Sequence, residues 1–181
     1  MEDASRETSL GEQFVTEARQ QLATSVSLIR HCLDRLDDAH VWWRPREDMN
    51  SVGNLLLHLT GNLTQRFGSV IGGEPDVRDR FGEFTERKLI PKEDLLRRFE
   101  DTARLADEIL GGLDSERLGE TRRYGLLAGT TEKSVLGVVL QTLTHISGHA
   151  QEILHLTRTQ QGDGYVFRQP AGVPPRLGGS R

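Results

Sequence analysis

The sequence predicts an all-α protein: a four-helix bundle with a long crossover between its second and third helices and an extended C-terminal tail. Two observations predict this fold. Four segments repeat apolar residues with the period of an α-helix, and the stretches between them are rich in glycine, proline and charged residues. The 181 residues are enough for one domain and few for two. We therefore expect a single domain over residues 1–181, with a core of about 9–160 and a tail of 161–181.

The first helix is predicted at about residues 9–36. Its apolar residues form a heptad-like stripe made of Val15, Ala18, Leu22, Val26, Ile29, Leu33 and Leu36. Pro45 breaks the helical period, and the nearby Trp42 and Trp43 offer apolar surface that can cover one end of a bundle.

The second helix is predicted from Asn50 or Ser51, either of which can cap exposed backbone donors, to about Ile71. A glycine pair and a proline follow and end it. Residues 72–90 then form a connection that is long enough to cross the bundle rather than make a tight hairpin.

The third helix is predicted over about residues 91–111, because Pro91 suits a first helical position and a glycine pair ends the apolar period. Residues 113–133 are irregular, and a short extended pair around 124–131 is one interpretation of them. The fourth helix is predicted over about 134–159. We interpret the glycine- and proline-rich tail that follows as an extended strap.

The composition excludes several classes of protein. The net charge is −4 and acidic and basic residues are interspersed, so nucleic acid is not an expected partner. No apolar run approaches the ~20 residues of a membrane span, and the N-terminal residues are polar rather than signal-like. The single cysteine, Cys32, rules out an intramolecular disulfide framework. We therefore expect a soluble, cytoplasmic protein without a membrane partner.

Two histidines on the predicted fourth helix have the spacing of a metal-binding pair. His145 and His149 are separated by one turn, so their side chains share a face and can point at one ion. They lie at the margin of the apolar arc of this helix, in a polar stripe that Gln141 and Glu152 continue. Such a stripe is where a bundle places a cofactor between facing helices.

The predicted second helix has a matching polar margin, formed by Asn54, His58, Asn62 and Gln65. If the two margins face each other, His58 and the histidine pair can converge on one divalent ion and leave at least one position for water or substrate. Asn62 and Glu152 are then candidates for orienting the ligands or for a further weak ligand.

An alternative interpretation needs no metal. In it the histidines are polar residues at the boundary of an ordinary helical bundle, each hydrogen-bonded to a neighbour. Spacing alone does not decide between the two interpretations. His31, His40 and His155 fall outside the shared stripes, and we predict that none of them is a ligand.

Two motifs resemble the DinB-like family of metal-dependent four-helix bundles. Residues Trp43–Pro45 followed by Asn50–Asn62 are similar to the family's loop and second helix, in which His58 occupies the position of the first ligand. His145–Ile153 is similar to the paired-histidine motif of the last helix. The resemblance covers most of the chain, and all three ligand positions of the family are occupied.

The resemblance implies a function and an assembly. It implies one divalent transition metal, with zinc and nickel as the first candidates, and it allows a low-molecular-weight thiol as co-substrate. Thiol-dependent transfer on a small-molecule substrate is the favoured reaction, and a metal-dependent hydrolase is the alternative enzyme. A non-catalytic metal-binding bundle or stress-related sensor is the alternative of a different class. Family members often form homodimers, for which Leu57 on the outer side of the second helix is a candidate contact.

Other residues are candidates for the chemistry and the pocket. Glu152 is the candidate catalytic base, provided that it reaches a molecule bound at the metal, and otherwise it is a solvated surface carboxylate. The two tryptophans, the 72–90 connection and the tail are expected to supply pocket walls. Three residues of that connection either line the pocket or merely pack it: Arg78, Asp79 and Phe81.

Overall fold

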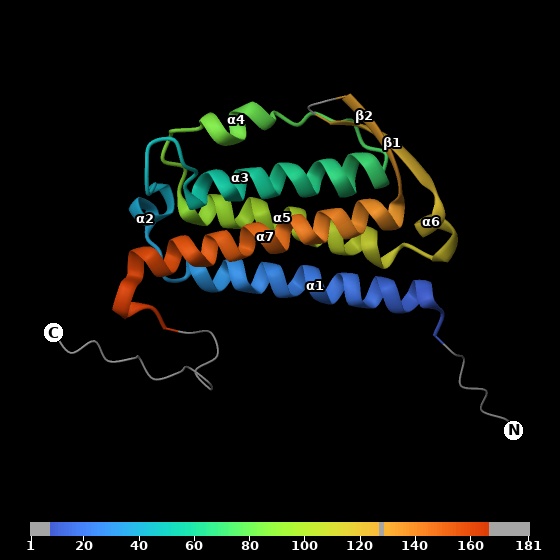
Figure 1. Cartoon of the computed structure of the whole chain (residues 1–181), viewed down its shortest axis with the longest axis horizontal. Coiled ribbons are helices and arrows are strands. Elements are labelled where there is room, and N and C mark those ends of the chain that lie inside the picture. The colour runs from blue at the N-terminus through green and yellow to red at the C-terminus, as the bar shows by residue number, and fades with distance from the viewer. Residues whose placement is uncertain (1–7, 127–128, 167–181) are drawn as a thin grey trace, which may run out of the picture.

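The computed structural model describes residues 8–126 and 129–166 and shows a mostly helical protein (Figure 1). Its long helical segments are α1 (Leu10–Leu33), α3 (Val52–Leu63) with its continuation η1 (Thr64–Ile71), α5 (Lys92–Gly111) and α7 (Val135–Gln161). The shorter elements are the helices α2 (Asp38–Trp42), α4 (Arg80–Thr85) and α6 (Ser115–Gly119), the strands β1 (Thr121–Leu126) and β2 (Gly129–Ser134), and the turn η2 (Gly162–Gly164).

The long helices lie side by side and enclose the core (Figure 1). Helix α1 packs against α7 and α5, and α3 packs against the same two helices, so the contacts close into a ring. Ile29, Leu56, Phe99 and Ile146, one from each long helix, are almost fully buried. The prediction of a mainly helical protein is confirmed. Among the described residues, no helix has the length and hydropathy needed to cross a bilayer.

A hairpin joins α6 to α7. Strands β1 and β2 pair antiparallel, with Thr121 opposite Ser134 and Tyr124 opposite Thr131. The extended pair considered from the sequence is therefore present, and it is longer than expected. Tyr124 is buried, because β1 lies against η1.

Helix α1 begins as predicted and ends earlier. Ser9 Oγ accepts a hydrogen bond from the backbone N–H of Glu12 at 3.2 Å, and Glu12 Oε2 accepts one from the backbone N–H of Ser9 at 2.7 Å. This capping box satisfies two backbone donors that the first helical turn leaves free. The helix ends at Leu33 rather than near Leu36, and Asp37 then caps the separate helix α2.

Ser51 begins α3, as predicted. Its Oγ accepts a hydrogen bond from the backbone N–H of Asn54 at 3.2 Å. Asn54 is fully buried, and its Nδ2 donates to the carbonyl of Glu83 at 2.9 Å. Arg44 Nη2 donates to Asn54 Oδ1 at 2.6 Å. One amide thus ties the start of α3 both to the crossover and to the loop that precedes the helix.

The second predicted helix reaches its expected end, but not as one α-helix, because η1 is π-helical. Its i→i+5 hydrogen bonds turn the chain through a smaller angle per residue than an α-helix does. As a result Arg66 is buried and lines a cavity with His58 and Asn62. Gln65, which was expected to continue this polar margin, turns toward the crossover, where its Oε1 accepts a hydrogen bond from Arg78 Nη1 at 3.0 Å.

The crossover holds the short helix α4, which lies along α3 (Figure 1). Asp79 caps α4, because its Oδ1 accepts a hydrogen bond from the backbone N–H of Gly82 at 2.9 Å. This turn places Glu83 on the inner side, where it is buried, and Phe81 on the outer side, where it is 78% exposed. The connection therefore supplies a buried carboxylate to the interior.

The tail is anchored where it leaves α7. After η2, the hydroxyl of Tyr165 lies 3.1 Å from His31 Nε2 on α1. Residues 167–181, which make up most of the predicted strap, lie outside the described residues.

Candidate metal centre

Three imidazole rings meet between α3 and α7. His58 comes from α3, and His145 and His149 come from successive turns of α7, which packs against α3. One ring nitrogen of each histidine lies within 4.8 Å of the others. His58 Nε2 and His145 Nε2 are 2.8 Å apart. The three histidines singled out from the sequence are thus brought together, and they can hold a metal ion.

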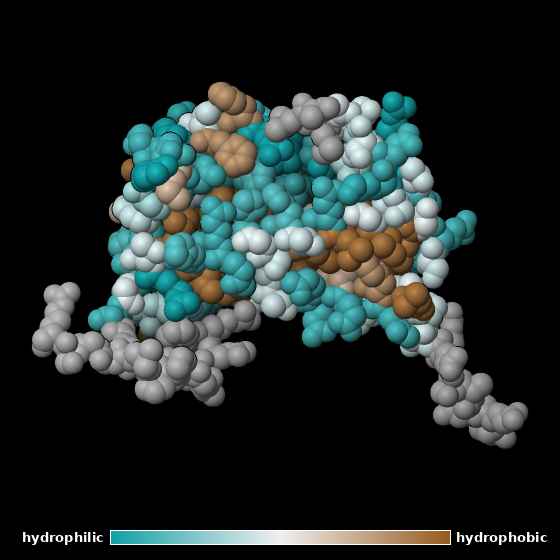
Figure 2. Space-filling model, in the orientation of Figure 1, coloured by the Kyte–Doolittle hydropathy of each residue, from teal (hydrophilic) through white to brown (hydrophobic). Residues whose placement is uncertain are grey.

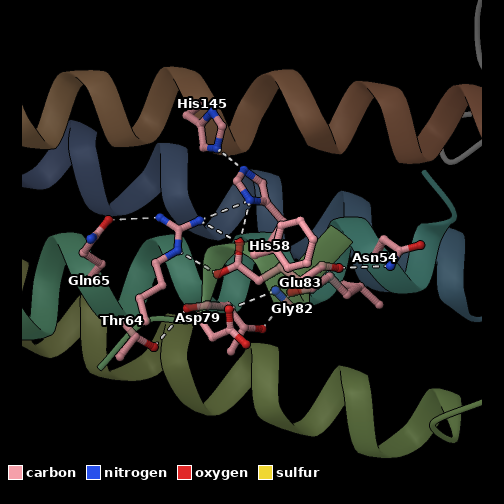
Figure 3. A network of polar contacts seen from close by, with 12 residues as sticks. Asn54, His58, Thr64, Gln65, Asp79, Gly82, Glu83 and His145 are labelled. Carbon is pink, nitrogen blue, oxygen red and sulfur yellow. Dashed lines mark hydrogen bonds and ion pairs between the residues drawn. The ribbon is translucent and has the colours of Figure 1, made fainter. Parts of the chain in front are cut away.

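A buried ion pair supports His58 from behind. Figure 3 shows His58 between His145 and Glu83. Glu83 Oε2 lies 2.9 Å from His58 Nδ1. Arg78 holds the same carboxylate, with Nε 2.7 Å from Oε1 and Nη2 2.9 Å from Oε2. Two parallel hydrogen bonds from one guanidinium fix the plane of the carboxylate and therefore the direction from which it meets the imidazole.

The charge of Glu83 favours one of the two tautomers of His58. Burial alone would raise the pKa of Glu83, but the hydrogen bonds and charges of Arg78 and His58 together outweigh burial and lower this pKa. Glu83 is therefore ionised at neutral pH, and an ionised carboxylate only accepts hydrogen bonds. The Glu83 contact favours the tautomer of His58 that carries its proton on Nδ1, although Arg78 Nη2, also a donor, lies 3.1 Å from the same nitrogen. This tautomer leaves the lone pair of Nε2 for a metal.

Glu152 orients His149 in the same way. Its Oε2 lies 2.8 Å from His149 Nδ1, within one turn of α7. The geometry supports the interpretation of Glu152 as an orienting residue, one of the roles expected from the sequence. Its role as a catalytic base stays a prediction.

His145 is neutral at physiological pH. Burial, followed by the neighbouring His149 and His58, lowers the pKa of His145 to about 4. A metal competes with protons for an imidazole nitrogen, so a depressed pKa leaves this ring ready to bind an ion.

The donor set fits a divalent transition metal. Zinc is bound by imidazole nitrogens at ~2.0–2.1 Å, so two ligands of a tetrahedral site lie about 3.3 Å apart. The 2.8 Å between His58 Nε2 and His145 Nε2 therefore has to open only slightly. Metal-binding histidines commonly donate their second N–H to a carboxylate, and Nδ1 of both His58 and His149 lies within hydrogen-bond distance of one here. Three protein ligands leave a further position for water or substrate.

Comparison with known proteins finds a family and a solved structure with a similar fold, and neither has a named activity. The model of a family described as a protein of unknown function, DUF1572, matches residues 9–169, which include all three histidines. The chain belongs to the DUF1572 family. No curated protein matches it.

A solved structure is similar to this DUF1572 protein. It is described as the crystal structure of the conserved protein of locus from Enterococcus faecalis. The two share 13% sequence identity and a TM-score of 0.61, over 79% of this chain and 94% of that chain. At this identity the similarity shows the fold alone.

Two charged residues beside the three histidines were not predicted from the sequence of this DUF1572 protein. Glu83 is the first of them. Asp79 is a helix-capping residue type and could have indicated that a helix begins there. A cap does not reveal which side of that helix faces the interior, so it could not single out Glu83. Arg66 was missed because the π-helical turn shifts the inner face of the helix. Arg78, considered only as a lining or packing residue, holds Glu83 in place.

The remaining histidines lie apart from the cluster. His31 contacts Tyr165, and His40 Nδ1 lies 2.6 Å from Asp37 Oδ1. His155 is exposed on α7. Within residues 8–126 and 129–166, the group of side chains able to hold a metal contains none of these three, as predicted.

The two tryptophans separate in the fold. Trp42 is buried over the start of α3, next to Gly53, and its Nε1 donates to the carbonyl of Ile90 at 2.9 Å. Trp43 is 38% exposed. Trp42 therefore covers the beginning of α3. Neither tryptophan lines the cavity beside the histidines, so the expectation that they supply pocket walls is not met there.

Proposed function

We propose that this protein is a metal-dependent enzyme of the DinB-like type, which holds one divalent transition ion with His58, His145 and His149 and catalyses thiol-dependent transfer on a small molecule. The observation that carries the proposal is the convergence of three imidazoles, two of them backed by carboxylates. The resemblance of the two histidine motifs to the DinB-like family supports the reaction class.

Such an ion supplies a nucleophile at neutral pH, because a divalent metal lowers the pKa of a bound water to ~7 and deprotonates a bound thiol. The residues of the chain prepare the site for it. Glu83, which Arg78 keeps ionised, and Glu152 fix the orientation and the tautomer of two of the ligands. A cavity lined by His58 and His145 gives a small molecule access to the centre.

The position of the carboxylates favours thiol chemistry over the alternative, a metal-dependent hydrolase. Hydrolysis commonly uses a general base within reach of the attacking water. Here both carboxylates next to the cluster, Glu83 and Glu152, bond to the outer nitrogens of histidines. Neither carboxylate is therefore free to assist hydrolysis by a metal-bound hydroxide, for instance by protonating the leaving group, whereas a metal-bound thiolate that displaces a halide needs no such assistance. A non-catalytic metal-binding bundle or stress-related sensor is the alternative of another class.

Metal content tests the site. Wild-type protein, stripped with a chelator and reloaded with zinc or nickel, should retain one ion per chain in elemental analysis. His58→Ala, His145→Ala and His149→Ala should each retain far less, because two imidazoles bind a divalent ion much more weakly than three. His155→Ala removes an exposed histidine from the same helix and is the matched control. Equal metal content in His58→Ala and wild type would refute the site.

Turnover separates the three functions. A thiol-dependent transferase should conjugate a low-molecular-weight thiol to a reactive aryl halide, and a hydrolase should cleave nitrophenyl esters without added thiol. A binding protein should do neither while it holds its ion. If the protein cleaved esters and conjugated no thiol, the proposal of a transferase would be wrong and that of a hydrolase would stand.

We also propose the finer features of fold and assembly: a single-domain bundle of the DinB type, cytoplasmic and homodimeric. The candidate contact is the face between α1 and the first half of α7, where Figure 2 shows hydrophobic surface and two hollows share Phe14: Leu10 lines one of them and Leu140 the other. Leu10 and Leu140 are exposed there, whereas Leu57 packs against the core. Leu140→Glu should convert a dimer to a monomer in light scattering, and an unchanged mass would exclude this face.

A further inference from the structure

A second buried cation lies beside the histidine cluster. Arg66, in η1, is 8% exposed. Its Nη1 atom is shielded from solvent and has no hydrogen-bond partner. Its guanidinium carbon lies 4.4 Å from the centroid of the Tyr124 ring, a cation–π contact with the hairpin. Within residues 8–126 and 129–166, no carboxylate forms an ion pair with it.

The neighbouring Arg78 shows what Arg66 lacks. Both guanidinium groups are buried, but Arg78 is held by both oxygens of Glu83. Burial lowers the pKa of Arg66, and a guanidinium nevertheless keeps its charge at neutral pH. A buried charge without a partner is costly, and a cation–π contact offsets only part of that cost. In the part of the chain that the structure describes, the positive charge of Arg66 therefore has no carboxylate to pair with.

Arg66 lines a small cavity that reaches the candidate metal centre. The cavity has a volume of about 190 Å³, and no carboxylate is among the described residues that line it: His58, Asn62, Arg66, Arg80, Gln141, Thr142 and His145. The Tyr124 hydroxyl donates to Gln141 Oε1 at 3.4 Å, so the amide N–H groups of Gln141 remain available to an acceptor. Two guanidinium groups and this amide give the cavity the donors that bind an anion.

We propose that Arg66 binds the carboxylate of a small substrate, with the rest of that molecule directed at the histidine cluster. This inference rests on the proposed function for the role of the cluster, and it adds the chemical class of the substrate. A guanidinium matches a carboxylate with two parallel hydrogen bonds, and a short acid fits the volume of the cavity. A neutral molecule in the same place would leave Arg66 without a partner.

Propionate and propionamide test this assignment, because they have the same shape and differ in charge. Binding is measured by NMR titration of ¹⁵N-labelled full-length protein, both metal-free and loaded with zinc. Propionate should bind wild type at least ten-fold more tightly than propionamide does. Arg66→Met should lower the propionate affinity at least ten-fold and leave metal content unchanged. Arg104→Met, which removes an exposed arginine from α5, is the control and should bind propionate like wild type.

A stability measurement separates binding from a structural role. If Arg66 served only to hold the hairpin through Tyr124, Arg66→Met would be destabilised in urea. We expect it to be as stable as wild type or more so, because it removes an unpaired buried charge. Arg66→Lys, which keeps the charge but loses the fork of donors, should bind propionate with intermediate affinity and serves in place of Arg66→Met if that variant does not fold.

The outcomes distinguish this inference from the proposed function. Equal affinities of wild type for propionate and propionamide, or an unchanged propionate affinity in Arg66→Met, would overturn the assignment of Arg66. Metal content is measured on the same samples. Protein that holds no metal but binds propionate through Arg66 would refute the metal-dependent function and still support the anion site.

Discussion

Glu83 meets His58 across 25 positions of sequence, with 2.9 Å between Oε2 of the carboxylate and Nδ1 of the imidazole. The contact joins the crossover to the middle of α3 at a place where both side chains are buried. The crossover therefore does more than connect two helices. It supplies the carboxylate that orients His58, a candidate ligand on α3.

Glu83→Gln should lower metal affinity by about 10–100-fold, the usual effect of losing a carboxylate behind a ligating histidine. Glutamine keeps the shape but loses the charge that holds the proton on His58 Nδ1 and that pairs with Arg78. Competition with a chromophoric chelator measures the affinity. Glu74→Gln, in an exposed part of the same crossover, is the control and should bind metal like wild type. Equal affinities in all three proteins would contradict the orienting role of Glu83.

Removing the metal should lower the melting temperature. An ion that binds only the folded state at 100 times its Kd adds about 2.7 kcal/mol to the free energy of unfolding. For a chain of 181 residues this corresponds to a shift of roughly 5–10 °C. Differential scanning fluorimetry with and without chelator measures it. His155→Ala should keep the full shift and His58→Ala should lose it, and a shift that survives in His58→Ala would place the ion elsewhere.

The metal-free protein should lose stability as the pH falls from 6.5 toward 4. Burial and the neighbouring histidines lower the pKa of His145 to about 4 in the folded protein, against an ordinary value of 6.5. Between these values the unfolded chain binds a proton that the folded chain does not, so stability present above pH 6.5 is lost on acidification. The loss is at most about 3.5 kcal/mol for this group, at about 1.4 kcal/mol per pKa unit.

Urea midpoints at pH 7.5 and 5.0, measured with chelator present, test the contribution of His145. His145→Gln removes the titrating ring and should show a smaller drop between the two pH values. His155→Gln, exposed on the same helix, should retain the drop of the wild type. If the urea midpoint fell equally between the two pH values in all three proteins, the loss of stability would come from titrating groups other than His145.

The sequence predicted those parts of the site that follow from helix periodicity. The stripe of His145 and His149 depends only on one turn of an α-helix, and the matching margin of α3 follows the same rule as far as Asn62. Beyond that residue the π-helical backbone exchanges the expected Gln65 for Arg66 on the inner side. A π-helical turn is decided by packing against other elements, so local periodicity does not reveal it.

The contact between Glu83 and His58 was beyond prediction for another reason. It depends on where a crossover without a clear period comes to lie, and the register of α4 on α3 is set by long-range contacts such as the bond from Asn54 to the carbonyl of Glu83. Periodicity assigns faces within an element, and it does not place one element upon another.

Gly61→Ala should weaken metal binding without altering any ligand. A Cβ at Gly61 would overlap Glu83 Oε1 and lie 3.1 Å from Arg78 Nε, so the buried pair would have to move away from His58. Moving this buried pair costs stability, but alanine is favoured over glycine in helices by about 1 kcal/mol and offsets part of that cost, so we expect only a modest change in the urea midpoint. We expect a loss of metal affinity comparable to that of Glu83→Gln. The matched control is Gly148→Ala on α7, where a Cβ meets nothing within 4 Å and metal affinity should be unchanged. Wild-type affinity in Gly61→Ala would mean that α3 tolerates the displacement of this pair and that the proximity of Glu83 to His58 does not govern metal binding.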